Sequence, residues 1–280
     1  LERCTIYNGG IIFIIVFNMK TNRFLIAILS VALCVNFVSC GDDDDNNIID
    51  PENVTKRVAT CTKKHPYYTI DYAINYDNGK VSKIVCLYGE YYAYDFSFSG
   101  NEAVATSEEK YGSYTDINNI KFSLNENGYC TSAIQTLIEK SDTFYEESAS
   151  NYEFTYNSDN QVIKAKFDDD DEEEYVYKNG VMVSSGVAEI ITYTDIPNIG
   201  NLFVAFTTNY RTTLDIWRFA GLLGKASKFL PKTASWYEGT ETYDYELDED
   251  GYVKTVKVTF RDTKGSERSY SYKYTYENIK

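Results

Sequence analysis

Apolar and polar side chains alternate along most of the chain beyond residue 57, which is the period of a β-strand. The alternation is clearest at 270–276, where tyrosine occupies every second position, and it recurs at 152–156 and 243–245. Since successive side chains of a strand point to opposite faces, each segment presents an aromatic face and a polar face. This pattern is typical of an antiparallel sheet with one wet side. We expect the tyrosine faces to form the core rather than a ligand platform, because each buried ring contributes a large apolar area.

Turn dipeptides separate many of these alternating runs. Asn-Gly and Asp-Gly pairs supply the positive φ angles that tight β-hairpin turns require, and Asp-Asn and Lys-Gly are weaker versions of the same signal. The sequence therefore predicts hairpins at 78–79, 127–128, 159–160, 179–180, 250–251 and 264–265.

Residues 196–231 break the alternation, and Pro231 offers a stop at their end. We predict a helix at 211–228, preceded at 199–206 by either a short helix or a buried strand, and we expect it to cover a sheet edge or an open barrel end. The fold class is thus all-β, mainly an antiparallel meander with a curved or barrel-like sheet and one helical insertion. The apolar residues that approximate helical spacing are Leu214, Trp217, Leu222, Ala226 and Phe229.

The first forty residues differ from the rest in their apolar runs. Residues 1–18 begin with Leu, and we expect them to lie upstream of a natural start at Met19. Two basic residues, the apolar run 24–38 and a small residue then make a signal peptide over 19–39. A retained transmembrane helix is the alternative, but neither apolar run reaches the roughly 20 residues that span a bilayer.

The segment Phe37-Val38-Ser39-Cys40 resembles the lipobox of bacterial lipoproteins, with Phe37 in place of the usual Leu. The resemblance implies cleavage before Cys40 and lipid attachment to its thiol, so that the membrane is a partner through this anchor. The acidic run 42–45 that follows resembles the signal that sends lipoproteins of Bacteroides-type bacteria to the outer face of the outer membrane. A periplasm-facing anchor is the alternative. We assign 40–56 to an acidic flexible tether, since like charges repel and stay extended, and 57–280 to a single domain of β-hairpins.

Composition excludes several classes of function. The formal net charge of −15 argues against a nucleic-acid partner, which normally needs a basic face. A single histidine, His65, leaves no second imidazole for a multi-His zinc site and makes a Ser-His-Asp triad improbable. Cys61, Cys86 and Cys130 can form at most one disulfide, and we expect Cys86 and Cys130 to be small buried residues in strands. No catalytic, cofactor-binding or metal-binding residue is assigned, and no cofactor is expected.

Acidic residues gather again at 168–174, where carboxylate oxygens could bind calcium. The spacing lacks the alternating ligands and the glycine of a defined calcium loop, so a solvated turn is the favoured interpretation. Residues 248–250 similarly predict a hairpin tip. Paired carboxylates for glycoside hydrolysis stay open, because so many acids allow many pairs.

The lipobox, the acidic tether and the hairpins together resemble a family of Bacteroides-type lipoproteins of unknown function with a porin-like fold. The most specific pieces are Asn198 to Leu202, Leu223 to Lys228, and Pro231, and the resemblance covers 57–280. It implies a curved or closed antiparallel sheet and carries no catalytic residues. We expect a soluble domain rather than a channel. A lipid-facing side would here carry mid-strand tyrosine instead of mainly Leu and Val, and an acylated protein already has a membrane anchor.

These observations predict a non-enzymatic lipoprotein on the cell surface, anchored in the outer membrane, that binds a glycan or an envelope protein. Trp236 and Tyr237 are a candidate exposed pair, although an ordinary strand start is the favoured interpretation of both. A carbohydrate-active hydrolase that uses paired carboxylates is the second hypothesis, and a structural envelope component is the third.

The lipid anchor is tested by the substitution Cys40→Ala. We expect it to abolish fatty-acid labelling of the protein in cells, because the thiol is the acceptor of the diacylglycerol. Labelling that persists in the variant would contradict the lipoprotein assignment.

Overall fold

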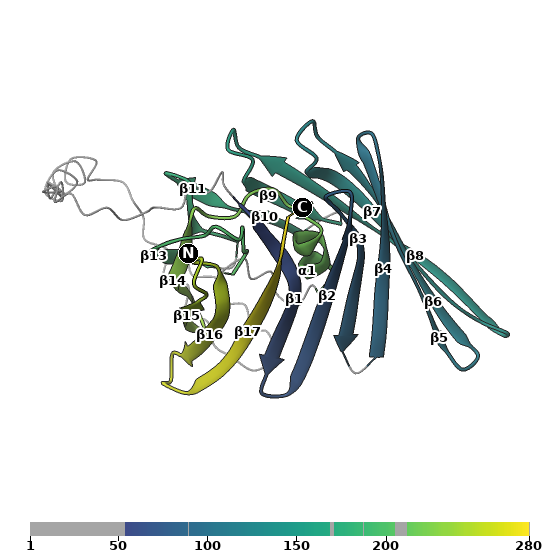
Figure 1. Ribbon diagram of the computed structural model, residues 1–280. Helices are drawn as coiled ribbons and strands as arrows, with labels where there is room; N and C mark the ends of the chain where they lie inside the picture. The colour runs from purple at the N-terminus through teal and green to yellow at the C-terminus, as the bar shows by residue number, and fades with distance from the viewer. Residues whose placement is uncertain (1–53, 89, 169–170, 187, 205–211, 280) are drawn as a thin grey trace, which may run out of the picture. The chain divides into compact units, whose positions relative to one another are not determined.

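A computed structural model describes residues 54–88, 90–168, 171–186, 188–204 and 212–279 (Figure 1). These residues belong to one compact unit, Ile48–Lys280, which is distinct from Leu1–Asn47. The predicted extension 1–18, the signal peptide 19–39, Cys40 and the acidic run 42–45 lie outside the described residues.

One antiparallel sheet of fifteen strands dominates the unit. Strands that are adjacent in the sheet are also consecutive in sequence, except that β1 pairs with β17. The sheet is therefore a meander. It does not close, and its two edge strands are β10 and β13. A two-stranded hairpin, β11 (Val176–Lys178) and β12 (Val181–Ser184), forms a separate sheet. The strands of the large sheet, in spatial order, are β10 (Asp171–Glu174), β9 (Val162–Phe167), β8 (Phe144–Tyr156), β7 (Cys130–Ser141), β6 (Tyr114–Leu124), β5 (Glu102–Tyr111), β4 (Glu90–Ser99), β3 (Lys80–Tyr88), β2 (Tyr68–Asp77), β1 (Lys56–His65), β17 (Glu267–Asn278), β16 (Val253–Asp262), β15 (Gly239–Leu247), β14 (Phe229–Trp236) and β13 (Ile190–Pro197).

All six predicted hairpin turns are confirmed. Between β2 and β3, Asn78 and Gly79 have φ angles of 49° and 80°, and Asn179 and Gly180 repeat the geometry between β11 and β12. The sequence missed hairpins that lack such dipeptides, as at 142–143 between β7 and β8.

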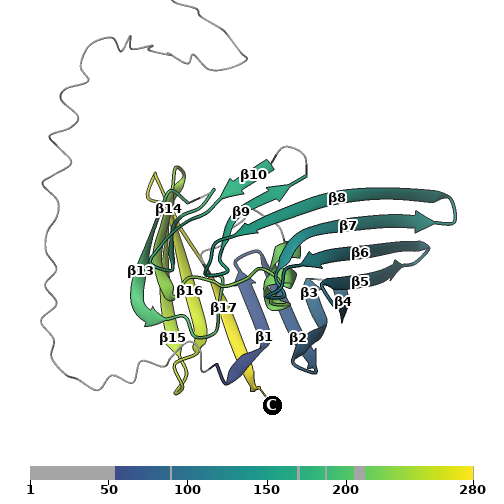
Figure 2. The same ribbon diagram turned by 90° about the horizontal axis from the view of Figure 1, so that it is seen from above.

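The sheet curves around the helix α1 (Thr212–Phe219), which lies against its concave face (Figures 1 and 2). Trp217 of α1 is fully buried, and its ring meets Phe122, Tyr152 and Phe154 edge to face at centroid distances of 5.1, 4.8 and 6.0 Å. Such arrangements are the favourable ones for aromatic pairs. The predicted tyrosine faces also belong to this core: Tyr152, Tyr243 and Tyr274 are buried, and Tyr156, Tyr245, Tyr270, Tyr272 and Tyr276 are half-buried against them.

The helix ends nine residues before the predicted boundary at 228. Gly221, with φ of 72°, follows the last turn, and the amides of Gly221 and Leu222 donate to the carbonyls of Arg218 and Trp217. This is the Schellman arrangement, which satisfies the terminal carbonyls and stops the helix. Residues 220–228 therefore continue as turns and extended chain, although Leu222 and Ala226 are still buried.

The segment before the helix was predicted as a short helix or a buried strand, and its described part, 199–204, is neither. The side chain of Asn198 accepts a hydrogen bond from the amide of Leu202 (2.9 Å) and donates to its carbonyl (2.8 Å). The side-chain amide of Asn198 thus satisfies the backbone N–H and C=O groups of Leu202, which in a helix or a strand would bond to other backbone groups.

The acidic run is not the simple turn that we predicted. Asp171–Glu174 form the edge strand β10, which pairs with β9, and Glu172 forms an ion pair with Lys164 at 2.8 Å. Residues 169–170 lie outside the described residues. A short, charged edge strand discourages further strand pairing.

Substitution of Gly224 tests the packing of the loop after α1 against the β8–β9 turn. Gly224 has φ of 77°, and a Cβ there would lie 2.3 Å from the carbonyl oxygen of Asn160, whereas Gly128 has φ of 82° and open space around it. We expect Gly128→Ala to cost about 1–2 kcal/mol for the backbone conformation alone. Gly224→Ala should cost clearly more, measured as the free energy of unfolding in urea by circular dichroism. Equal losses in the two variants would contradict this packing.

Candidate functional site

A cavity of about 1150 Å³ lies on the concave face, lined mainly by β1, β2, β17, α1 and the loop 199–204. Small-molecule sites usually measure about 300–1,000 Å³, so the space is large enough for an extended ligand. The residues that line it come from both ends of the domain's sequence because β1 pairs with β17.

Aromatic rings form a row along one wall of the cavity. The His65 ring stacks on Tyr68 with centroids 4.6 Å apart, and Tyr68 meets Tyr88 edge to face at 5.4 Å. On β17, Tyr270 and Tyr272 lie 5.8 Å apart. Because β1 pairs Lys63 with Tyr272 and β2 pairs Tyr68 with His65, alternate residues of three adjacent strands share this face.

The three carboxylates in the described lining of the cavity are each held by protein donors. Glu241 is only 6% exposed and accepts hydrogen bonds from the hydroxyls of Tyr243 and Tyr270, both at 2.6 Å. Burial raises the pKa of these two tyrosines well above the usual value, so their hydroxyls keep the protons that they donate. Asp215 forms an ion pair with Arg218 at 3.0 Å. A third acidic residue, Glu238, accepts from the hydroxyl of Tyr237 at 3.0 Å.

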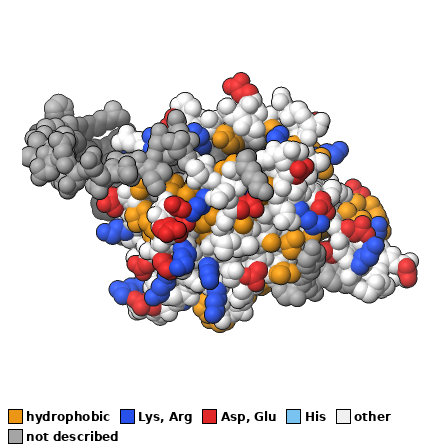
Figure 3. All heavy atoms as spheres, in the orientation of Figure 1, with side chains coloured by type: hydrophobic (Ala, Val, Ile, Leu, Met, Phe, Trp, Pro, Cys, Tyr) orange, Lys and Arg blue, Asp and Glu red, His pale blue; other side chains and the backbone are white. Residues whose placement is uncertain are grey.

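Basic side chains outnumber acidic ones in the lining, although the chain as a whole is acidic. Three of them have acidic partners: Lys56 pairs with Asp248 and Asp250, Arg57 with Glu277, and Arg218 with Asp215. Three others, Lys63, Lys80 and Arg268, lie over aromatic rings instead. On the face seen in Figure 3, by contrast, acidic and basic side chains are interspersed.

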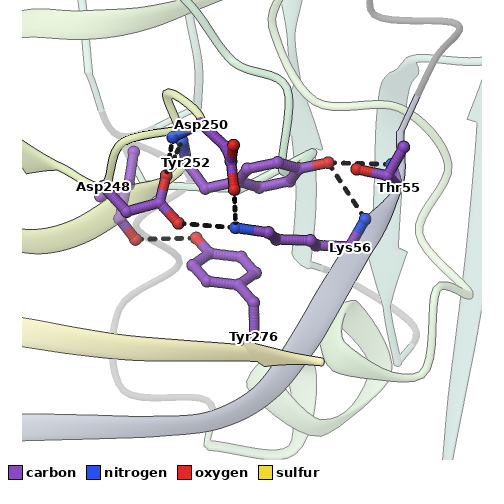
Figure 4. A network of polar contacts seen from close by, with 7 residues as sticks. Thr55, Lys56, Asp248, Asp250, Tyr252 and Tyr276 are labelled. Atoms are coloured by element: carbon purple, nitrogen blue, oxygen red, sulfur yellow. Dashed lines mark hydrogen bonds and ion pairs between the residues drawn. The ribbon is translucent and has the colours of Figure 1, made fainter. Parts of the chain in front are cut away.

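Lys56 belongs to a polar network that holds the start of β1 against the β15–β16 turn (Figure 4). Its ammonium donates to Asp248 at 3.1 Å and to Asp250, and the hydrogen bond to Asp250 raises the pKa of Lys56. The hydroxyl of Tyr252 accepts from the backbone amides of Thr55 and Lys56 at 3.0 and 3.1 Å. The network therefore fixes the point at which the chain enters the sheet.

The three described cysteines are free and buried, as expected for Cys86 and Cys130. Cys61 and Cys86 flank Tyr72 from the strands on either side of it. Their Cα atoms are therefore separated by two strand spacings, about 9.6 Å, which exceeds the limit of roughly 7 Å for a disulfide. Cys61 and Cys86 cannot be bridged in this arrangement. Within the described ranges, no group of three His, Cys, Asp or Glu side chains could hold a metal ion.

Of the predicted aromatic pair, Trp236 lines the cavity and Tyr237 is exposed to solvent. Trp236 ends β14, lines the cavity and stacks on Phe260 at 5.4 Å, whereas Tyr237 lies in the following turn with 80% of its surface exposed. Neither residue starts a strand, so that interpretation is wrong. Sequence reasoning missed Lys63, Asp215, Glu241 and Arg268; for Arg268 a signal existed, because it lies two residues before Tyr270 and therefore on the tyrosine face.

No helix among the described residues is long and apolar enough to cross a membrane. No protein-family model and no curated protein matches the chain. Two crystal structures are similar to it. A porin-like protein from Bacteroides uniformis has a TM-score of 0.57 and 17% identity, over 80% of this chain and 98% of that one. A porin-like protein from Bacteroides vulgatus has a TM-score of 0.49 and 16% identity, over 80% of this chain and all of that one. The first likeness confirms the porin-like fold that the sequence resemblance implied.

The buried thiols give a test of the core under the cavity. Burial raises the pKa of Cys86 to about 11 and that of Cys130 to about 12, and it raises the pKa of Cys61 further. At pH 8, about a thousandth of a thiol with pKa 11 is thiolate, against about a quarter in an unfolded chain with pKa near 8.5. We therefore expect iodoacetamide to label all three cysteines slowly in the native protein and rapidly in urea, as followed by peptide mass spectrometry. Rapid native labelling of Cys86 would contradict the described packing.

Proposed function

We propose that this chain is a lipid-anchored envelope protein that binds a saccharide in the cavity on the concave face and catalyses no reaction. The row of rings from His65 and Tyr68 to Tyr270 and Tyr272 is the observation that carries the proposal. A sugar presents flat C–H faces that can pack on such rings, and its hydroxyls can bond to the tyrosine hydroxyls at their margin. A cavity with an apolar wall and a few convergent polar groups is the usual form of a ligand site.

The proposed location rests on the sequence. The lipobox at 37–40 supports an anchor at Cys40, and the acidic run 42–45 supports display on the outer face of the outer membrane. A partner in this setting would be a glycan, or another envelope protein, rather than a nucleic acid. The structural likeness supports the fold and leaves the location to experiment.

Hydrolysis is the less favoured use of the same cavity. Asp215 and Glu241 both line it, but Asp215 is paired with Arg218 and Glu241 accepts from two tyrosines. Both carboxylates are therefore engaged by protein donors, whereas a hydrolytic pair needs carboxyl groups that are free to reach the substrate. A structural role in the envelope is the third alternative.

Calorimetric titration against neutral and acidic plant and host polysaccharides tests the proposal. We expect saturable binding, no release of reducing sugar, and a loss of about two- to tenfold in affinity on Tyr67→Ala, since a ring contact contributes about 0.5–1.5 kcal/mol. Tyr67 is 88% exposed and lines the cavity, so the substitution should leave the fold intact.

The matched control is Tyr145→Ala on β8, where the ring is 63% exposed and does not line the cavity. Equal loss in both variants, or no binding to any saccharide, would contradict the proposal. Product release would favour a hydrolase, and co-purification of an envelope protein in the absence of saccharide binding would favour a structural component.

A further inference from the structure

Two basic residues line the cavity from adjacent strands. Lys63 lies on β1 opposite Tyr272, and Arg268 lies on β17 four residues before it. Because alternate residues of a strand share a face, Arg268 lies on the face of Tyr270, Tyr272 and Lys63. Both Lys63 and Arg268 line the cavity.

Neither cation has an acidic partner among the residues that the structure describes. The ammonium of Lys63 lies 5.6 Å from the centre of the Tyr272 ring, and the guanidinium of Arg268 lies 4.5 Å from that of Phe260. The acidic residues of this region are engaged elsewhere: Glu241 accepts from Tyr243 and Tyr270, and Glu238 accepts from Tyr237. Three other basic residues of the lining, Lys56, Arg57 and Arg218, do form ion pairs.

The charges of both Lys63 and Arg268 act on the ring of His65. Its ring lies 6.0 Å from that of Tyr270 and stacks on Tyr68, and it follows Lys63 by two residues on β1. Burial, and then the charges of Arg268 and Lys63, lower the pKa of His65. Both cations therefore act on this ring, and the carboxylate of Glu241 acts on Tyr270 and Tyr272 of the same wall.

We propose that the saccharide bound in the cavity is acidic, with carboxylates held by Lys63 and by Arg268 while its rings pack on the adjacent tyrosines. The inference rests on the proposed function and deepens it. Arginine presents parallel N–H donors that match the two oxygens of a carboxylate, and lysine adds a compact positive charge. A bound carboxylate thus supplies the acidic partner that neither cation has in the protein itself.

The test compares an oligogalacturonate with its methyl ester, which removes the charge and keeps the sugar rings. We expect the intact protein to bind the acid form at least about tenfold more tightly by calorimetry, since hydrogen bonds to charged groups contribute about 1.5–3 kcal/mol. Lys63→Met and Arg268→Gln should each weaken binding of the acid form by about five- to tenfold and leave binding of the ester unchanged. The matched control is Lys64→Met, which removes the same charge from the next residue of β1, on the opposite face.

The outcomes separate this inference from the proposed function. Equal affinity for the acid and the ester would overturn the acidic specificity while the saccharide site stands. A loss in Lys64→Met equal to that in Lys63→Met would show long-range attraction rather than a site, and it would also overturn the inference. Failure of both probes to bind would overturn the inference, while binding of a neutral polysaccharide would still support the proposed function; circular dichroism of each variant shows whether it is folded.

Discussion

The burial of Trp217 against Phe122, Tyr152 and Phe154 is the contact on which the concave face depends. A sheet that curves this strongly leaves one aromatic face without a second sheet to cover it, and α1 covers part of that face. An eight-residue helix is about 12 Å long, whereas a ten-residue strand such as β1 spans about 33 Å. The helix therefore covers only part of the wall, and the cavity is the part that it leaves open.

The pairing of β1 with β17 determines which residues face that opening. This pairing joins the two ends of the domain's sequence inside the sheet, with nine strands beyond β1 and four beyond β17, and it places Lys63 opposite Tyr272. The network around Lys56 and Tyr252 fixes the start of β1 relative to the β15–β16 turn. A slip of one residue in this register would turn Lys63 and His65 to the outer face, so the composition of the cavity depends on a long-range contact.

The local features of the fold could be predicted from the sequence. The alternation at 270–276 and the Asn78-Gly79 turn are decided by neighbouring residues alone, and both are confirmed. The helix boundary could not be predicted from apolar spacing, because Gly221 stops a helix whose apolar pattern continues. β10 was missed because pairing with β9 outweighs the repulsion within an acidic run. The site was missed for a further reason. The face on which Arg268 lies can be predicted from its position in the strand, but its place on the same wall as Lys63 depends on the pairing of β1 with β17, which are distant in sequence.

A crystal structure of the protein with an oligogalacturonate would show whether the wall formed by β1, β2 and β17 is a saccharide site. We expect sugar density in the cavity, packed against Tyr68 and Tyr272 with a carboxylate within hydrogen-bond distance of Lys63 or Arg268. Sugar bound only elsewhere, for example on the exposed ends of β5 to β8, with the cavity empty of ligand, would contradict this expectation.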